Sequence, residues 1–160
     1  MSDAIELLSS NRERLAVVHQ TGERDYNAVR LAYEQRGFHA EVAPFLSDMP
    51  NRFAQADLII CRSGAITVAE IAAAGRAALF IPFGAATDSY QLRNAQEMVN
   101  AGAARLISES ELTGERLARE ILNLVDDPGR LVELGALARQ MARPSAAKDI
   151  VDLIEGVALH

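Results

Sequence analysis

Residues 56–70 read ADLIICRSGAITVAE, and this stretch decides the fold. It opens with the apolar run Leu58–Cys61, which has the length and content of a buried strand. A loop of small residues, 62–67, follows and leads into a helix predicted over 67–74. Gly75 then ends the helix, because glycine readily adopts the left-handed conformation of a helix C-terminus. A buried strand that turns directly into a helix is the repeating unit of α/β proteins with a parallel sheet.

The same alternation continues on both sides of this stretch. Apolar runs and helical spacing predict further strands over 15–19, 40–45, 77–83 and 105–107, a helical turn over 53–56, and further helices over 25–36, 90–101, 113–125, 129–141 and 145–157. Repeated strand–helix units predict a Rossmann-like parallel sheet with helices on both faces. No linker or internal repeat is evident, so we expect one domain over residues 1–160.

The composition excludes several classes of protein. The net charge of −6 argues against a nucleic-acid partner, which would need a basic surface. No apolar run approaches the roughly 18 residues of a membrane span, and the N-terminus lacks the features of a signal peptide. The single cysteine, Cys61, lies in an apolar run and is expected to be a buried, inert thiol. These features are consistent with a cytoplasmic protein.

The loop at 62–67 is the best candidate for a ligand site. In a parallel sheet the loops that follow the strands share the carboxyl edge, where ligands bind. Small residues at Ser63 and Gly64 let the backbone approach a ligand closely. The helix that follows offers unpaired N–H groups and a positive dipole end, which suit a phosphate. Many such turns bind nothing, so this signal alone is weak.

Several polar residues near this edge allow two interpretations. Thr67 and Glu70 have the spacing of a capping box, which spacing alone favours, but the Glu70 carboxylate could also accept both hydroxyls of a ribose. Gln91 and Asn94 share a helix face and could bind sugar hydroxyls or be solvated surface residues. Asp88 could cap that helix. His19 could orient a loop as easily as take part in chemistry, and no cluster of ligands predicts a metal site or a cofactor.

Five segments together resemble the MurG family of glycosyltransferases. They are residues 56–70, the sequence QLRNA at 91–95, AGAA at 101–104, HQTG at 19–22 and FLSDM at 45–49. The resemblance runs from about Leu15 to about Ile154, and the order and spacing of the segments make it specific. It implies the C-terminal, donor-binding half of a GT-B glycosyltransferase, in which two Rossmann-like domains face each other across a cleft.

The resemblance also implies an activity. Members of this family transfer N-acetylglucosamine from UDP-N-acetylglucosamine to a lipid-linked muramoyl-pentapeptide in peptidoglycan synthesis. The N-terminal domain of the family binds the lipid acceptor and associates with the inner face of the cell membrane. The resemblance also implies that the donor diphosphate is bound without a metal ion, so neither a metal nor a cofactor is expected.

The matching motifs assign roles to single residues by resemblance. The backbone at Leu46 would read the uracil, and the main chain at Ala65, Ile66 and Thr67 would meet the diphosphate. Further assignments are Glu70 for the ribose hydroxyls, Gln91 and Asn94 for the hydroxyls of N-acetylglucosamine, and His19, Ser63 and Gly64 as supporting residues. The resemblance therefore favours the functional interpretation of Glu70, Gln91 and Asn94. No catalytic residue is assigned, because the family's candidate base lies in the other domain.

This chain departs from the family pattern at its start. The donor domain of the family opens with a strand and a glycine-rich phosphate loop, whereas this chain begins in what resembles the helix that follows them. We therefore expect the chain to be inactive alone, to lack a central strand and to leave a sheet edge unprotected. It would act with an acceptor domain on the same or a separate chain. The alternative is a non-catalytic nucleotide-sugar-binding or docking subunit of a two-chain transferase, and a UDP-sugar epimerase is a distant third reading.

Overall fold

The strands form two parallel sheets in a computed structural model that describes residues 2–84 and 89–158. Strands β1 (Val17–Gln20) and β2 (Ala40–Ala43) pair with each other, and β3 (Leu58–Cys61), β4 (Ala77–Phe80) and β5 (Arg105–Leu106) form the second sheet. All strand pairs are parallel, with Val17 opposite Ala40 and Leu58 opposite Ala77. The prediction of parallel strands is confirmed, but the expected single sheet is divided in two. Asp88 lies outside the described residues.

The predicted helices are all present. They are α2 (Tyr26–Gln35), α3 (Met49–Gln55), α4 (Ala65–Ala74), α5 (Ser89–Asn100), α6 (Gly114–Val125), α7 (Pro128–Gln140) and α8 (Ala146–Ala158). Helix α1 (Ser2–Leu8) occupies the place of the initial helix that the resemblance implies, and short 3-10 turns lie at Ser9–Arg14 and Glu109–Glu111. Side chains cap two helices, since Thr113 accepts the Arg116 N–H and Asp127 accepts the Arg130 N–H.

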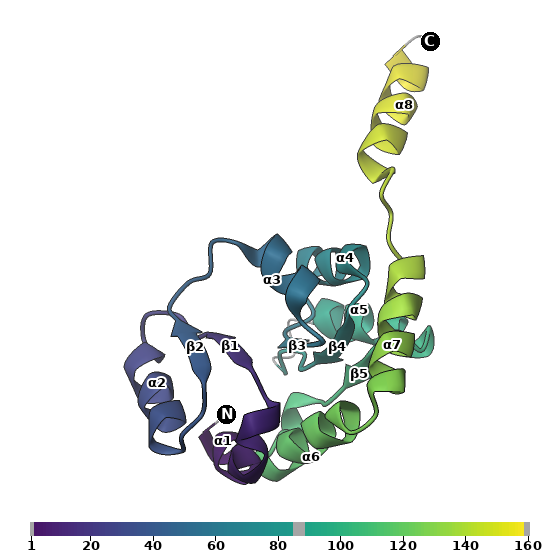
Figure 1. Cartoon of the computed structure of the whole chain (residues 1–160). Coiled ribbons are helices and arrows are strands. Elements are labelled where there is room, and N and C mark those ends of the chain that lie inside the picture. The colour runs from purple at the N-terminus through teal and green to yellow at the C-terminus, as the bar shows by residue number, and fades with distance from the viewer. Residues whose placement is uncertain (1, 85–88, 159–160) are drawn as a thin grey trace.

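Helices cover both faces of the larger sheet (Figure 1). On one face, helices α1, α2 and α6 pack against β1–β4 through a core that includes Ile5, Tyr33, Leu79 and Ile121. On the other face, α3, α4, α5 and α7 contribute to a second core around Phe80. Leu79 and Phe80 are neighbours in β4 yet belong to different cores, because successive side chains of a strand point to opposite faces.

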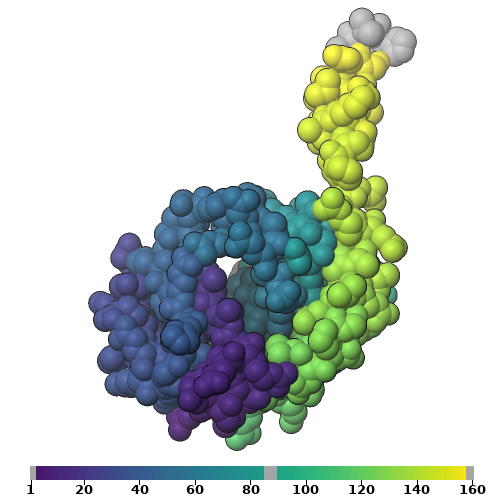
Figure 2. Space-filling view, viewed as in Figure 1, coloured from purple at the N-terminus to yellow at the C-terminus, as the bar shows by residue number. Residues whose placement is uncertain are grey.

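Helix α8 stands apart from the rest of the molecule (Figure 1). Residues 143–157 are all exposed, and the apolar side chains of α8 face solvent with them. The space-filling view shows the same helix as a projection joined to the body by a narrow segment (Figure 2). No described helix has the length and apolar content that crossing a membrane requires.

Candidate functional site: the loop after β3 and the start of α4

Helix α4 begins at the carboxyl end of β3, and its first N–H groups have no acceptor among residues 2–84 and 89–158. Gly64 is the N-cap residue, with φ −61° and ψ 146°, and no side chain caps the helix. The first intrahelical bond runs from the Val68 N–H to the Gly64 carbonyl at 3.0 Å. The N–H groups of Ala65, Ile66 and Thr67 precede this bond and lack an intrahelical acceptor. They form a cluster of donors at the positive end of the helix dipole.

The capping-box interpretation of Thr67 and Glu70 is wrong. Helix α4 starts at Ala65, so both residues lie within it and neither can cap its N-terminus. The Glu70 side chain is exposed and lies one turn after Ile66 on the same helix face. Ile66 itself is 78% exposed. Glu70 is therefore accessible from solvent on the face that continues from the open N–H groups.

Gln91 and Asn94 are structural partners of the loop, and the solvated-surface interpretation is also wrong. The Asn94 side-chain amide donates to the Ser63 carbonyl at 3.0 Å, and the Ser63 hydroxyl donates to the Gln91 carbonyl at 2.8 Å. Ser63 is fully buried. The Gln91 amide oxygen accepts the Phe83 N–H at 3.2 Å. Helix α5 is thus tied to the loops that follow β3 and β4, and Ser63, Gly64, Gln91 and Asn94 come together as one unit.

Arg62 and Glu109 form a clamp at the same edge that the sequence analysis missed. Arg62 donates to the carbonyls of Ile81 and Pro82, both at 3.0 Å, and to the Glu109 carboxylate at 2.8 Å. Glu109 also accepts the Gly84 N–H at 2.6 Å. The hydrogen bond from Arg62 holds the pKa of Glu109 below its usual range. The clamp fixes the loop after β4 beside the loop after β3. Arg62 lies within residues 56–70, but nothing in the sequence around Glu109, which is 47 residues away, indicates that the two residues pair.

Leu46 and His19 belong to the other sheet. The Leu46 N–H donates to the Gln20 side-chain oxygen at 2.9 Å, so it already has a partner. The His19 ring packs edge-on against Tyr33, with 3.2 Å between Nδ1 and the phenol oxygen. Burial lowers the pKa of His19 and raises the pKa of Tyr33 to about 12. His19 therefore supports the core beneath β1, and within the described residues no hydrogen bond joins it or Leu46 to α4.

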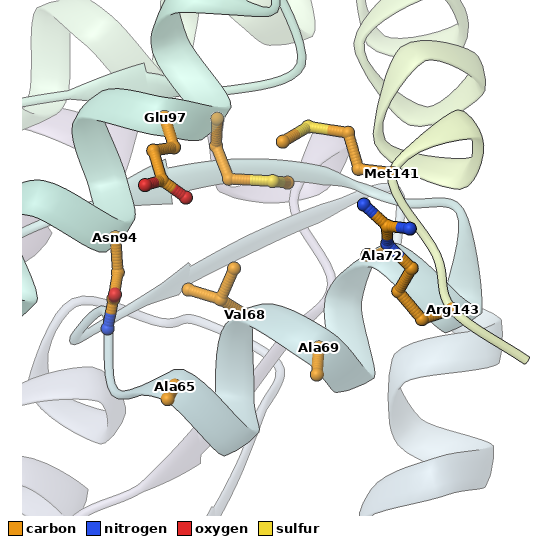
Figure 3. A pocket seen from close by; sticks show the side chains of 9 residues that line it. Ala65, Val68, Ala69, Ala72, Asn94, Glu97, Met141 and Arg143 are labelled. Carbon is orange, nitrogen blue, oxygen red and sulfur yellow. The ribbon is translucent and has the colours of Figure 1, made fainter. Parts of the chain in front are cut away.

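A groove runs between α4 and α5 beside this site (Figure 3). Its volume is about 280 Å³, and its lining is mostly apolar. Asn94 lies at one end of the groove and Arg143 at the other (Figure 3). Glu97 and Arg143 are the charged residues of the lining. Ala65 at the start of α4 and Asn94 both line this groove, so the groove begins at the N–H groups of the first turn. Glu70 lies on the same face of α4 as Ile66.

Comparison with known proteins identifies the family. Residues 1–153 match the model of the glycosyltransferase family 28 C-terminal domain. The chain belongs to this family. A relative from Geotalea uraniireducens is 45% identical over 152 residues, and one from Solibacter usitatus is 47% identical over 142 residues. Both are named UDP-N-acetylglucosamine--N-acetylmuramyl-(pentapeptide) pyrophosphoryl-undecaprenol N-acetylglucosamine transferase.

The family 28 domain also has solved structural neighbours. Acinetobacter baumannii MurG superposes with a TM-score of 0.85 and 35% identity, covering 97% of this chain and 46% of that one. A glycosyltransferase of kitacinnamycin, with a TM-score of 0.68 and 24% identity, shares the fold. The fold is that of the C-terminal half of a GT-B glycosyltransferase, and the chain is a MurG-like C-terminal domain.

The family 28 domain covers only part of these relatives. The match to the Geotalea protein covers 95% of this chain and 42% of that protein, and the match to the Solibacter protein covers 89% of this chain and 38% of that protein. The relatives are named transferases, so the family is one of hexosyltransferases. The named transferase activity belongs to these relatives, which are more than twice as long as this chain.

Proposed function

We propose that this domain binds UDP-N-acetylglucosamine as the donor half of an N-acetylglucosamine transferase of peptidoglycan synthesis. The observation that carries the proposal is the open first turn of α4, with Glu70 and Asn94 close to it on the same helix pair. A diphosphate needs several donors and positive potential, and this turn supplies both in an acidic domain. The names of the relatives give the donor sugar and the acceptor.

The diphosphate would lie on the N–H groups of Ala65, Ile66 and Thr67. The Thr67 hydroxyl can add a hydrogen bond, because it is in the first turn and half-buried. Gly64 leaves the approach open, since a Cβ at this position would meet no atom within 4 Å. Glu70 would accept both ribose hydroxyls with its two carboxylate oxygens. Ser63, which is buried beneath the loop, holds this backbone in place.

Gln91 and Asn94 would combine positioning with recognition of N-acetylglucosamine. The Asn94 amide nitrogen is used by Ser63, whereas its oxygen has no hydrogen bond to the described residues. That oxygen can accept a sugar hydroxyl. The Gln91 oxygen accepts the Phe83 N–H, so Gln91 would hold the loop after β4 beside the sugar. Substitution of either residue would therefore disturb both the loop and the sugar.

The uracil would be read by the backbone of Leu46, with His19 as a supporting residue. One residue that offers both N–H and C=O matches uracil, whereas cytosine presents the reversed pair and would leave polar groups unpaired. The Leu46 N–H is bound to Gln20 in the structure, so uracil binding requires the Gln20 side chain to give up this hydrogen bond. His19 would act at a distance, by fixing β1 through Tyr33.

The transfer would be a direct displacement at the anomeric carbon. The acceptor oxygen forms the new bond to this carbon, the bond from the carbon to the diphosphate oxygen breaks, and the electron pair leaves with UDP. The acceptor hydroxyl gives its proton to a base in an N-terminal acceptor domain, on the same or a separate chain. The open N–H groups of α4 stabilise the charge that grows on the leaving diphosphate. The whole enzyme would act in the cytoplasm, at the inner face of the membrane where its lipid acceptor lies.

The alternative is a non-catalytic nucleotide-sugar-binding or docking subunit of a two-chain transferase. Exposed helix α8 favours a role that involves a partner, since its apolar side chains face solvent and the helix stands apart from the body of the domain (Figure 1). Both functions use the same donor site. They differ in whether transfer appears when a separate acceptor-domain chain is added, which a radiolabelled-sugar transfer assay measures.

Calorimetric titration of the purified chain with UDP-N-acetylglucosamine, UDP and CDP tests donor binding. We expect heat with the two uridine compounds and none with CDP. Glu70→Ala should weaken binding about tenfold or more, as loss of a charge-assisted hydrogen bond of about 1.5–3 kcal/mol predicts. Glu155→Ala is the matched control, because it removes an exposed helical carboxylate on α8, away from the site.

Three outcomes would contradict the proposal. Equal binding of UDP and CDP would exclude uracil recognition at Leu46. Full UDP affinity in Glu70→Ala would exclude a ribose contact at that residue. Measurable transfer by the purified chain alone would show that no acceptor domain is needed. Folding of each variant is checked by circular dichroism before titration.

A further inference from the structure

The side chain of Arg62 connects the loops that follow all three strands of the larger sheet. Arg62 comes directly after β3, and its guanidinium donates to the carbonyls of Ile81 and Pro82 after β4, both at 3.0 Å. The same guanidinium donates at 2.8 Å to the carboxylate of Glu109, which lies in the 3-10 turn after β5. One side chain therefore holds three loops together at the carboxyl edge, where we place the donor.

Glu109 extends this connection to the backbone of the loop after β4. Its second carboxylate oxygen accepts the Gly84 N–H at 2.6 Å. A Cβ at Gly84 would lie only 2.6 Å from that oxygen, so a larger residue at this position would displace the carboxylate. The Arg62 guanidinium also lies over the Phe83 ring, 5.2 Å from its centroid. The clamp thus fixes residues 83 and 84 through both backbone and side chain.

The loop that the clamp fixes is also bound to helix α5. The Phe83 N–H donates to the Gln91 side-chain oxygen at 3.2 Å. The hydroxyl of Ser63 donates to the Gln91 carbonyl at 2.8 Å, and the Ser63 carbonyl accepts the Asn94 amide at 3.0 Å. The positions of Gln91 and Asn94 therefore depend on the loops after β3 and β4, which the clamp joins.

The clamp is better suited to holding loops than to binding the diphosphate itself. The positive charge of Arg62 is paired with the Glu109 carboxylate, so little net charge is left for an anion. Within the described residues no hydrogen bond joins the clamp to Leu46 or Glu70, the proposed uracil and ribose contacts. A change in the clamp should therefore affect the residues that meet the sugar more than those that meet the nucleotide.

We propose that Arg62, acting with Glu109, is a positioning residue that sets the choice of donor sugar. This inference rests on the proposed function, in which Gln91 and Asn94 meet the sugar hydroxyls. Epimeric sugars differ only in the direction of one hydroxyl, so telling them apart requires side chains held to within about 0.5 Å. The clamp supplies this precision through the loop after β4, without touching the sugar.

Calorimetric titration with UDP, UDP-N-acetylglucosamine and its epimer UDP-N-acetylgalactosamine tests the inference. We expect the unsubstituted chain to prefer UDP-N-acetylglucosamine to the epimer. Arg62→Lys keeps the charge but loses the planar fork that reaches two carbonyls and a carboxylate. The preference between the epimers should fall about tenfold, while affinity for UDP changes less than about twofold, because only the sugar residues are misplaced.

Two further variants separate the clamp from a general effect of losing an ion pair. Glu109→Gln has one acceptor oxygen where the clamp uses two, so it should reproduce the effect of Arg62→Lys. The double variant should be no worse than either single variant, because the two residues act as one unit. Arg130→Lys is the matched control, since Arg130 pairs with Glu133 within α7 and is partly exposed like Arg62. It should leave all three affinities unchanged.

Hydrogen exchange followed by NMR gives a measurement that needs no donor. In Arg62→Lys the amides of Phe83 and Gly84 should exchange about tenfold faster or more, because the loop opens more often. The amide of Ile81 donates to the Cys61 carbonyl within the sheet and should be unchanged. It reports that the fold of the variant is intact.

The possible results separate this inference from the proposed function. Binding of UDP with an unchanged epimer preference in both clamp variants would overturn the inference alone, as would unchanged exchange at Phe83 and Gly84. The absence of any epimer preference in the unsubstituted chain would have the same consequence. Equal loss of affinity for all three ligands would make Arg62 a diphosphate contact and not a positioning residue for the sugar. No binding of UDP by the folded, unsubstituted chain would overturn the proposed function and the sugar role with it.

Discussion

At the scale of single residues, the polar side chains of the proposed donor site hold the surrounding loops in place. Ser63 is fully buried and joins β3 to α5 through its hydroxyl and carbonyl. Arg62 bridges from the end of β3 to Glu109 and to two carbonyls after β4. The residues that resemble a donor-binding motif are therefore also the residues that shape the loops.

Asn94→Asp tests the structural half of this dual role. Aspartate keeps the shape of asparagine but, when ionised, cannot donate to the Ser63 carbonyl 3.0 Å away. We expect the free energy of unfolding to fall by about 1–3 kcal/mol, the cost of leaving a half-buried polar group unpaired. Urea denaturation measures it. Asn100→Asp on the same helix is the control, because Asn100 accepts from Gln96 through its oxygen, and aspartate retains that acceptor. Equal losses in the two variants would contradict the prediction.

His19 predicts a specific pH dependence of stability. Burial lowers its pKa in the folded chain, and unfolding restores the ordinary value of about 6.5. The unfolded chain then binds a proton more readily, so the full stability is present above pH 6.5 and declines as the pH falls below it. We expect His19→Gln to flatten the change in urea midpoint between about pH 8 and pH 5.5. An unchanged slope would show that other groups cause it.

At the scale of elements, the end of α4 is as closely constrained as its start. Gly75 ends the helix in the left-handed conformation, with φ 65°, and its carbonyl lies against α7. A Cβ at Gly135 of α7 would come within 2.5 Å of the Gly75 carbonyl oxygen. The close approach of α7 to the end of α4 depends on the absence of that side chain.

Gly135→Ala should therefore destabilise the domain although alanine favours helix. The clash is with backbone, so α7 or the turn at Gly75 must move, and overpacking of this kind costs about 1–3 kcal/mol. Thermal unfolding measures the loss. Gly156→Ala in α8 is the matched control, since its Cβ would meet no atom within 4 Å, and it should leave Tm unchanged. A higher Tm for Gly135→Ala would show that helix propensity outweighs the contact.

At the scale of the whole molecule, the chain is a layered body from which one helix stands apart (Figure 1). The apolar residues Ile150, Leu153, Ile154 and Val157 of this helix, α8, are exposed. Folded domains normally bury an apolar surface of this kind.

Removal of residues 144–160 should leave the stability of the body unchanged. Residues 143–157 are exposed, so α8 contributes no buried area to the two cores. A helix of 13 residues without packing is marginal in water. We expect Tm in differential scanning calorimetry to agree with that of the full chain within about 2 °C, less than the shift that 1 kcal/mol causes. A drop of several degrees would mean that α8 folds back onto the body.

The sequence by itself determined the type and order of the elements. Strand β3 is found at the residues predicted, and Gly75 ends α4 as expected, because apolar runs and glycine act through local backbone chemistry. The loop after β3 stays a predicted site, and the structure shows that the helix following it begins without a side-chain cap. The start of α4 was placed two residues late, since small residues such as Ala65 suit a loop and a helix equally.

Only the tertiary structure decided how these elements meet. The pairing of Arg62 with Glu109 and the hydrogen bonds between Ser63 and helix α5 join residues 28 or more positions apart, and the division into two sheets is likewise set by the tertiary structure. No periodicity reports such contacts, because each depends on where the backbone returns after a helix. The same reason explains the division into two sheets: a local pattern assigns a strand, but the partner of each strand edge is determined by the packing of the whole molecule.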